Sequence, residues 1–359
     1  MKLLHCADIH LDSVMESNLS PERAKERKRE LLGGFASMVQ YGAEHDVRGV
    51  LIAGDLFDGA SCAKRTRTYV LDLIAGHPQM EFYYLSGNHD EGEVGFTDPK
   101  SPLPENLHVF SDAWQEYRLE NVSIWGCVDP SGKETYDALT PDPERVNIAV
   151  LHGQVYESDT RFDGGVNLRA LAGRGLDYVA LGHIHSYRID KLDARGTYCY
   201  AGCPEGRGFD ECGEKGCVTV EARSGKIDYS FEKMSIRRLE EVKVDISGLL
   251  SEREIERACE QALDGIPTGC MVSLVLTGSY TVDTYKSLDA LKSKLLSDFF
   301  FGRVRDESRL KINIDDYKND ISLKGEFIRS VLESDMDRNK KEQVIMCGLL
   351  ALNGEDMPT

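Results

Sequence analysis

The sequence predicts an α/β fold made of two successive units, and three observations carry this prediction. In the first half of the 359-residue chain, short apolar runs alternate with stretches of helical character. Each main apolar run leads into a polar cluster, as strands do where a ligand site lies at the edge of a sheet. After Phe231 the elements continue without such clusters, which indicates a second, smaller α/β unit.

The first half is expected to contain five main strands, each a run of aliphatic or aromatic residues. They lie at 2–6, 49–53, 81–86, 146–151 and 178–181. Helices are expected at 20–39 and 62–75, and a strand-rich stretch at 107–128. The first helix starts at Ser20-Pro21-Glu22, where a capping residue, a proline and an acid favour a helix start. Its basic residues alternate with glutamates and are typical of a solvated helix face: Arg23, Lys25, Arg27, Lys28 and Arg29.

The second half is expected to alternate strands and helices again before a helical tail. Strands are predicted at 237–246, 271–276 and 299–304, and helices at 251–263 and 284–296. The tail, 323–352, is predicted to form two helices around a polar turn at 335–341. We therefore expect a main domain at 1–233, a small α/β domain at 234–310 and a C-terminal helical segment at 311–359.

Composition restricts the class of protein. Hydrophobic residues make up 41% and charged residues 29%, without a long apolar run or a signal-like start, which predicts a cytoplasmic protein that does not enter a membrane. The ten cysteines are scattered, which favours reduced thiols. We interpret four of them as ordinary thiols of an irregular loop more readily than as a zinc site: Cys199, Cys203, Cys212 and Cys217. The net charge of −18 argues against a broadly basic nucleic-acid surface.

The polar clusters at the strand ends share a chemistry. Taken together they supply two carboxylates, one amide and four imidazoles: Asp8, His10, Asp55, Asn88, His152, His183 and His185. Oxygen donors mixed with imidazole suit Mn, Fe or Zn, and because seven ligands are too many for one ion, two ions sharing a bridging carboxylate are predicted. Each motif alone could be a turn or a polar strand face, but five of the nine histidines fall at these strand ends.

The ordered motifs DIH, GDLFD, GNHD, LHG and GHIH resemble the calcineurin-like metallophosphoesterase superfamily over roughly the first two thirds of the chain. Within it, HCADIHLD, LIAGDLFD and AGCPEGRGFDECGEKG are similar to SbcD-type DNA double-strand-break repair nucleases of a short bacterial branch. The resemblance implies a metallophosphoesterase β-sandwich flanked by helices, followed by a small α/β cap domain and a C-terminal helical segment.

The resemblance also implies a role for each site residue. Asp8, His10 and His185 would hold one ion, Asn88, His152 and His183 would hold the other, and Asp55 would bridge the two. His89 would approach the scissile phosphate, with Asp58 as its carboxylate partner and Asp90 as the local alternative. The attacking group would be a metal-activated hydroxide, with Mn as the expected metal and Fe or Zn as alternatives. Arg207 would contact a phosphate or form a structural salt bridge with Glu205 or Glu211.

The activity implied by the resemblance is DNA exonuclease or endonuclease hydrolysis, carried out with an SbcC-like SMC-type ATPase and commonly as a dimer. The ATPase would dock on the C-terminal helices, although these could equally pack on their own core through Phe327, Val331, Leu332, Val344, Ile345, Leu349 and Leu350. The alternatives are a phosphodiesterase or phosphatase for nucleotides or other small phosphoesters, and a scaffold subunit that regulates its partner.

Overall fold

The computed structural model describes residues 1–15, 19–59, 62–90, 96, 102–130, 132–158, 164–223, 226–281, 284–311 and 320–353. The chain divides into two compact units, Met1–Leu239 and Glu240–Thr359. This division does not separate the expected cap domain from the C-terminal segment, so the three predicted boundaries stay predictions.

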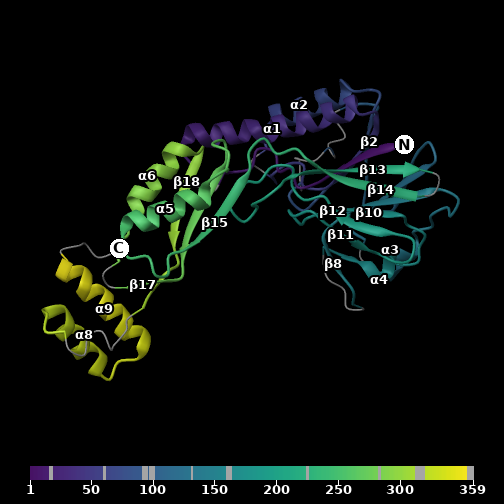
Figure 1. The fold of residues 1–359 in the computed structure, drawn as a ribbon. Helices are drawn as coiled ribbons and strands as arrows, with labels where there is room; N and C mark the ends of the chain where they lie inside the picture. Colours follow the sequence, from purple (N-terminus) through teal and green to yellow (C-terminus); the bar gives the residue numbers. More distant parts are fainter. Residues whose placement is uncertain are drawn as a thin grey trace. The chain divides into compact units, whose positions relative to one another are not determined.

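The first unit contains two six-stranded sheets (Figure 1). The first sheet has the order β14-β13-β1-β2-β3-β4. Its strands are β1 (Lys2–Cys6), β2 (Val47–Ala53), β3 (Glu81–Leu85), β4 (Leu107–Val109), β13 (Gly216–Arg223) and β14 (Lys226–Lys233). Strands β1 to β4 are mutually parallel, and β13 is antiparallel to both β1 and β14.

The second sheet has the order β11-β12-β10-β7-β6-β5. Its strands are β5 (Gln115–Leu119), β6 (Val122–Gly126), β7 (Val146–His152), β10 (Tyr178–Gly182), β11 (Arg188–Lys191) and β12 (Thr197–Tyr200). The central strands β6, β7, β10 and β12 are parallel, and the two edge strands β5 and β11 are antiparallel to their neighbours. A separate short ladder joins β8 (Gln154–Tyr156) to β9 (Gly165–Asn167).

The two sheets pack face to face and helices cover their outer faces. One buried cluster, which includes Leu3, Leu51 and Val150, draws residues from both sheets and fills the space between them. Helices α1 (Pro21–Glu44) and α2 (Lys64–Ala75) pack on the outer face of the first sheet. Helices α3 (Lys133–Asp137) and α4 (Leu168–Leu171) pack on the outer face of the second sheet. The predicted β-sandwich flanked by helices is therefore confirmed.

The central strands are apolar because both of their faces are covered. All seven residues of β7, Val146–His152, are buried, and β10 is buried over its whole length. Parallel strands covered on both faces carry continuous rather than alternating hydrophobic residues. The polar residues therefore begin at the carboxyl ends of these strands, and several of them, such as Asp8 and Asp55, are still buried.

Helix α1 begins as expected but is not solvated along its whole basic face. The Ser20 side chain accepts a hydrogen bond from Arg23 N, which caps the helix. Arg27 is completely buried, and its guanidinium donates to Glu205 Oε2 at 3.3 Å and to the Gly206 carbonyl at 2.6 Å. The prediction of a solvated face was wrong at Arg27, because the partners that bury it lie far away in the sequence.

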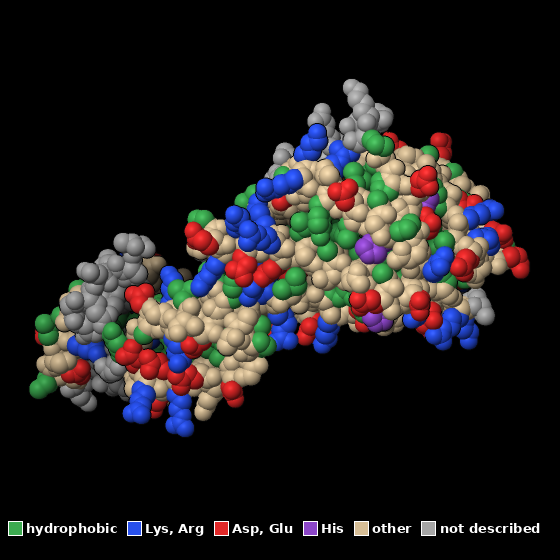
Figure 2. All heavy atoms as spheres, turned by 90° about the horizontal axis from the view of Figure 1, so that it is seen from above, with side chains coloured by type: hydrophobic (Ala, Val, Ile, Leu, Met, Phe, Trp, Pro, Cys, Tyr) green, Lys and Arg blue, Asp and Glu red, His purple; other side chains and the backbone are tan. Residues whose placement is uncertain are grey.

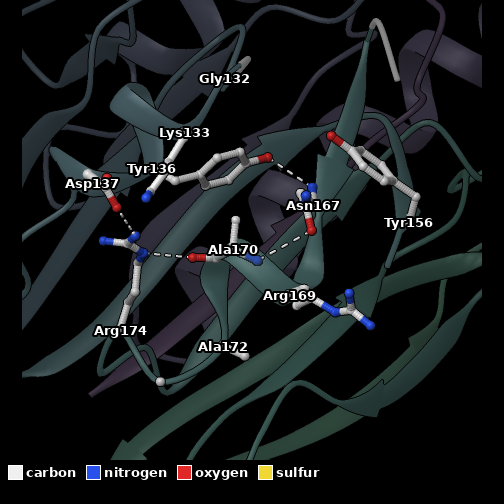
Figure 3. Close-up of a pocket in the computed structure, with 11 residues that line it drawn as sticks. Gly132, Lys133, Tyr136, Asp137, Tyr156, Asn167, Arg169, Ala170, Ala172 and Arg174 are labelled. Atoms are coloured by element: carbon white, nitrogen blue, oxygen red, sulfur yellow. Dashed lines mark hydrogen bonds and ion pairs between the residues drawn. The ribbon is translucent and has the colours of Figure 1, made fainter. Parts of the chain in front are cut away.

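A hollow of about 680 Å³ lies beside α3 and α4 (Figure 3). Its lining includes Lys133, Tyr136, Tyr156 and Asn167, and Arg174 pairs with Asp137 at its rim at 2.6 Å. Within the described part of the chain, its lining contains no candidate site residue.

The second unit contains a three-stranded sheet, β15 (Leu239–Asp245), β16 (Met271–Thr277) and β18 (Phe301–Asp306). Helices α5 (Glu252–Leu263) and α6 (Leu288–Asp298) pack against it around a separate core. Helix α6 begins four residues later than expected, because the Ser287 side chain accepts from Ala290 N and caps it there. A short ladder of β17 (Ser279–Tyr280) with β19 (Arg309–Leu310) completes the sheets.

The C-terminal segment is a helical hairpin of α8 (Leu323–Glu333) and α9 (Arg338–Asn353). Ile328, Val331, Ile345 and Leu349 are buried in its own core, and Phe327, Leu332 and Val344 pack against them. The predicted contact residues thus serve the hairpin itself, and the side chain of Leu350 lies outside the described residues. Among the described residues, every helix is too short or too polar to cross a membrane.

Candidate metal centre

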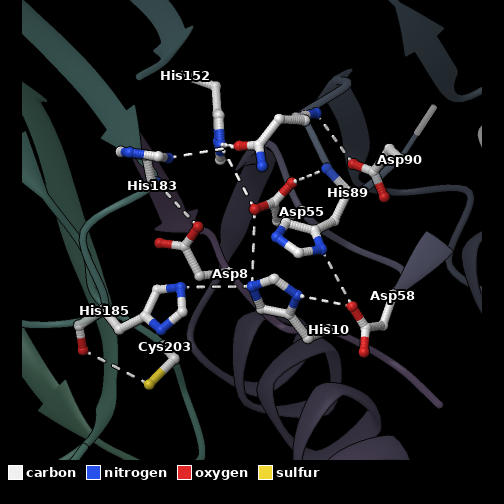
Figure 4. Close-up of polar contacts among 12 residues, drawn as sticks. Asp8, His10, Asp55, Asp58, His89, Asp90, His152, His183, His185 and Cys203 are labelled. Atoms are coloured by element: carbon white, nitrogen blue, oxygen red, sulfur yellow. Dashed lines mark hydrogen bonds and ion pairs between the residues drawn. The ribbon is translucent and has the colours of Figure 1, made fainter. Parts of the chain in front are cut away.

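The candidate site lies where β1, β2, β3, β7 and β10 end (Figure 4). The predicted residues follow directly on these strand ends, or in the case of His152 occupy the last strand position. The structure brings all nine of them together: Asp8, His10, Asp55, Asp58, Asn88, His89, His152, His183 and His185.

Asp8, His10 and His185 form one donor group, with one ligand atom each and all three within 4.8 Å of one another. The Nε2 atoms of His10 and His185 are 3.4 Å apart. The backbone N–H of His183 donates to Asp8 Oδ1 at 2.8 Å. Asp8 Oδ2 is buried and has no hydrogen-bond partner among the described residues, so one carboxylate oxygen is left for a cation.

A second donor group forms around His152. Its Nε2 lies 2.9 Å from Asn88 Oδ1 and 3.4 Å from Asp55 Oδ2. His183 Nδ1 lies 3.4 Å from the same Asn88 oxygen. Asp55 Oδ2 also lies 3.6 Å from His10 Nε2, so this carboxylate reaches both donor groups.

The donors fit divalent metal ions. His152 Nδ1 donates to the Ala53 carbonyl at 2.9 Å, so in the neutral ring Nε2 carries a lone pair. That lone pair faces the oxygens of Asn88 and Asp55, which are acceptors as well. Acceptors that face one another repel unless a cation lies between them, and mixed nitrogen and oxygen donors suit a borderline or hard transition metal.

Burial shifts the pKa values of Asp8, His10 and His183 toward their neutral forms, whereas at His185 the hydrogen bond to Glu211 outweighs burial and the pKa rises. Desolvation raises the pKa of Asp8 to about 6 and lowers that of His10 to about 2. Desolvation also lowers the pKa of His183, which the neighbouring His152 lowers further. Neutral imidazole is the form that binds metals, so burial prepares these histidines as ligands.

The backbone at the site is strained. Four of the seven non-glycine residues with positive φ in the described chain are candidate ligands: Asp8 at 52°, His10 at 49°, Asp55 at 53° and His183 at 97°. Such conformations cost free energy and persist where the surrounding structure holds them, most often at functional sites. At Gly87, an added Cβ would lie 2.2 Å from Asp55 Oδ1, so this turn requires glycine.

His89 sits at the rim of the site beside Asp58. Its Nδ1 lies 3.2 Å from Asp58 Oδ1, and its side chain is 48% exposed. Asp90 has a different environment, because it is buried and accepts hydrogen bonds from the backbone N–H groups of Leu56, Phe57 and Gly87. His10, Asp58 and His89 also lie within 4.8 Å of one another, so geometry alone allows His89 to act as a ligand as well as an acid.

Glu211 is the site residue that sequence reasoning did not select. Its Oε1 accepts from His185 Nδ1 at 2.6 Å and from Arg207 Nη2 at 2.9 Å. Arg207 thus forms the ion pair with Glu211 that the sequence had left open, and a phosphate contact stays a prediction. Burial raises the pKa of Glu211, but the hydrogen bonds from His185 and Arg207 outweigh burial, and the pKa falls well below its usual range. The signal in the sequence that could have identified Glu211 was its place in the glycine-rich GRGFDECGEKG loop next to Arg207.

A sandwich with paired donor groups at its strand ends defines a metal-dependent phosphoesterase. The chain belongs to the calcineurin-like phosphoesterase family, whose profile matches residues 1–187. This family uses divalent metal ions.

Several named relatives are similar to this chain at low identity. The metallophosphoesterase YhaO of Bacillus subtilis is 27% identical over 69% of this chain, a match that spans 64% of its own length. The DNA double-strand break repair protein Mre11 of Sulfolobus acidocaldarius is 24% identical, covering 93% of this chain and 87% of that protein. The SbcD component of the nuclease SbcCD from Escherichia coli K12 is 25% identical, covering 96% of each chain.

Proposed function

We propose that this phosphoesterase is an SbcD-type DNA nuclease, which hydrolyses DNA phosphodiester bonds with two divalent ions. The observation that carries the proposal is the pair of donor groups reached by one carboxylate, Asp55, with an exposed histidine at their rim. Two adjacent metals suit an in-line displacement at phosphorus, because they can neutralise charge on both the attacking and the leaving oxygen.

In this proposal Asp8, His10 and His185 hold one ion, and Asn88, His152 and His183 hold the other, with Asp55 between them. When bound, the ions supply Lewis acidity and a deprotonated water at neutral pH. Mn is the proposed metal, with Fe or Zn as alternatives, because all three accept mixed imidazole and carboxylate ligands.

His89 has a separate role. Asp58 Oδ1 lies 3.2 Å from Nδ1 of its ring, so Nε2 at the opposite edge stays available to a substrate phosphate (Figure 4). A protonated ring in this position can donate a proton to the leaving oxygen or hydrogen-bond to the phosphate. Asp90 is proposed to support the loop, since three backbone groups already occupy its carboxylate.

The DNA substrate is proposed from the relatives. Mre11 is named as a DNA double-strand break repair protein and the Escherichia coli relative as part of a nuclease, and both matches extend over most of this chain. The net charge of −18 opposes unaided DNA binding. An SMC-type ATPase partner would supply phosphate contacts that this chain lacks, and the bound ions would lower the local negative charge.

The proposed ATPase contact on the C-terminal helices must use residues other than their core. Ile328, Val331, Ile345 and Leu349 are buried between the helices. Leu323 and Leu352 are 69% and 45% exposed and remain available to a partner.

The test is digestion of end-labelled duplex and single-stranded DNA by the full chain with Mn²⁺, with and without the SMC-type ATPase. We expect Mn-dependent release of labelled products that EDTA stops. Hydrolysis of small phosphodiesters without any DNA cleavage, even with the ATPase present, would contradict the nuclease assignment.

A phosphodiesterase or phosphatase for nucleotides or other small phosphoesters is the second candidate. It is favoured by the net charge of −18 and by the surface seen in Figure 2, where acidic and basic side chains are interspersed. A small substrate needs no extended basic surface, because the two ions themselves bind its phosphate.

A further inference from the structure

The loop between β12 and β13 holds His185 through several contacts at once. Glu211 Oε1 lies 2.6 Å from His185 Nδ1. Lys215 Nζ donates to the His185 carbonyl at 2.7 Å, and Cys203 Sγ donates to the same oxygen at 3.5 Å. Both the ring and the backbone of this one histidine are therefore fixed by the loop.

Glu211 is built into its position. Its side chain is 4% exposed, and its second oxygen, Oε2, accepts from the backbone N–H of Arg207 at 2.7 Å. Arg207 Nη2 also approaches His185 Nδ1 at 3.2 Å, but the ionised Glu211 carboxylate has only acceptors, so Nδ1 and Nη2 both direct their protons to Glu211 Oε1. Arg207 thereby compensates the buried charge of Glu211, and His185 Nδ1 donates the second hydrogen bond to the same oxygen.

The geometry points to Glu211 as a positioning residue that fixes the tautomer and the ring orientation of His185. With the Nδ1 proton held by the carboxylate, the neutral ring presents the Nε2 lone pair on the side of His10, whose Nε2 is 3.4 Å away. A carboxylate behind a metal-binding histidine also raises the electron density at the coordinating nitrogen, which strengthens the metal bond. The inference rests on the proposed two-metal function, because it assigns His185 to one of the two ions.

Metal binding by the metal-free 359-residue chain tests this inference without any substrate. Isothermal titration with MnCl₂ should show two sites in the wild type. Glu211→Gln, which keeps the shape and one acceptor oxygen, and Glu211→Ala should weaken one site, the alanine variant by about 10- to 100-fold. The EPR signal of an exchange-coupled Mn pair should give way to that of single ions in Glu211→Ala.

Glu205→Gln is the matched control. Glu205 lies in the same loop as Glu211, is 2% exposed and pairs with Arg27 of α1. Among the described residues it makes no hydrogen bond or ion pair with a candidate ligand. This variant should lower thermal stability and leave both Mn affinities unchanged. If Glu205→Gln weakens Mn binding as much as Glu211→Gln, the loop acts through general stability and the inference is overturned.

The remaining outcomes are also decisive. If Glu211→Ala fails to fold, Glu211→Gln decides, and wild-type affinity at both sites in that variant overturns the inference. A wild type that binds two Mn ions but cleaves no DNA contradicts the proposed nuclease, while selective loss of one site in the Glu211 variants still supports the positioning role. A wild type that binds no Mn overturns both.

Discussion

His89 is well exposed, as is its neighbour Asn88, and it lies at the rim of the donor groups beside a carboxylate. Its side chain is 48% exposed, whereas Asp8 and His10 are essentially buried. Its close partner is the Asp58 carboxylate at 3.2 Å. A ring placed in this way is open to a substrate while its partner holds it in one orientation.

Replacing His89 by alanine should therefore remove chemistry and leave metal binding intact. We expect His89→Ala to lower the rate of DNA cleavage by about 10²- to 10⁴-fold, the usual contribution of a general acid. Mn titration should still show two sites. His108→Ala is the control, since His108 also pairs with a carboxylate, Glu81 at 2.7 Å, outside the site. Loss of one Mn ion in His89→Ala would instead identify His89 as a ligand.

Gly87 shows how the backbone constrains the bridging carboxylate. Because an added Cβ would lie 2.2 Å from Asp55 Oδ1, Gly87→Ala must displace Asp55 or the turn. We expect a loss of about 1–3 kcal/mol in the free energy of unfolding, as for other overpacked sites, and weaker binding of both Mn ions. Urea unfolding and Mn titration measure the two effects.

Gly33→Ala is the matched substitution for Gly87→Ala. Gly33 lies inside α1, and an added Cβ would meet only Ile236 Cδ1 at 3.8 Å, an ordinary contact. Alanine is the better helix former, so this variant should gain up to about 1 kcal/mol and bind Mn normally. Equal effects of the two substitutions would show that the Asp55 contact is unimportant.

At the scale of the element, α1 is tied to the 205–206 loop by a buried charge. Arg27 contacts Glu205 Oε2 and the Gly206 carbonyl, so its removal leaves a buried acceptor and a buried carboxylate without their partner. Arg27→Met should lower the free energy of unfolding by about 3–5 kcal/mol, the usual cost of breaking a buried ion pair from one side. Arg29→Met, on the exposed surface of the same helix, should change it by less than about 0.5 kcal/mol. Urea denaturation of both variants checks the difference, and equal values would contradict a structural role for Arg27.

The elements that sequence reasoning predicted are those with strong local signals. The strand β1 was placed at 2–6, where the structure has it, because an uninterrupted apolar run ends abruptly at polar residues. The candidate ligands were found for the same reason, since each follows such a run. One polar residue beyond a buried strand could belong to a turn, but polar clusters at the carboxyl ends of five strands converge on one edge and indicate a site.

What could not be predicted depends on contacts between distant segments. Arg27 and Glu205 are 178 positions apart, and His185 and Glu211 are 26 positions apart with β11 and β12 between them. The start of α6 shifted because a cap at Ser287 competed with helical periodicity. The positive φ angles of Asp8, His10 and His183 are also invisible in the sequence, because the surrounding fold imposes them against the local preference.

At the scale of the whole molecule, the chain consists of two units with separate cores. The core clusters of the sandwich and of the three-stranded sheet share no residue in the described chain. Every candidate ligand belongs to the first unit, Met1–Leu239. Ligands bound to one unit stabilise that unit directly, whereas the stability of the other unit changes only if the two units unfold cooperatively.

Metal should therefore shift the thermal unfolding of one unit and not of the other. We expect two calorimetric transitions in the EDTA-treated chain. Mn²⁺ at about 100 times its dissociation constant should stabilise the unit 1–239 by about 2.7 kcal/mol for each site. For a unit of this size, one such site raises Tm by about 5–10 °C. The second transition should stay in place.

Asp55→Asn provides the control for this experiment. Because the Asp55 carboxylate reaches both donor groups, the variant should keep both transitions and lose most of the Mn-dependent shift. The contradicting outcome is a single transition that moves as a whole with Mn²⁺, or an equal shift of two transitions. A single transition would mean that the two units unfold as one cooperative body, in which case binding at the strand ends of the sandwich also stabilises the sheet and helices of residues 240–359. Equal shifts of two separate transitions would mean that Mn²⁺ stabilises both units.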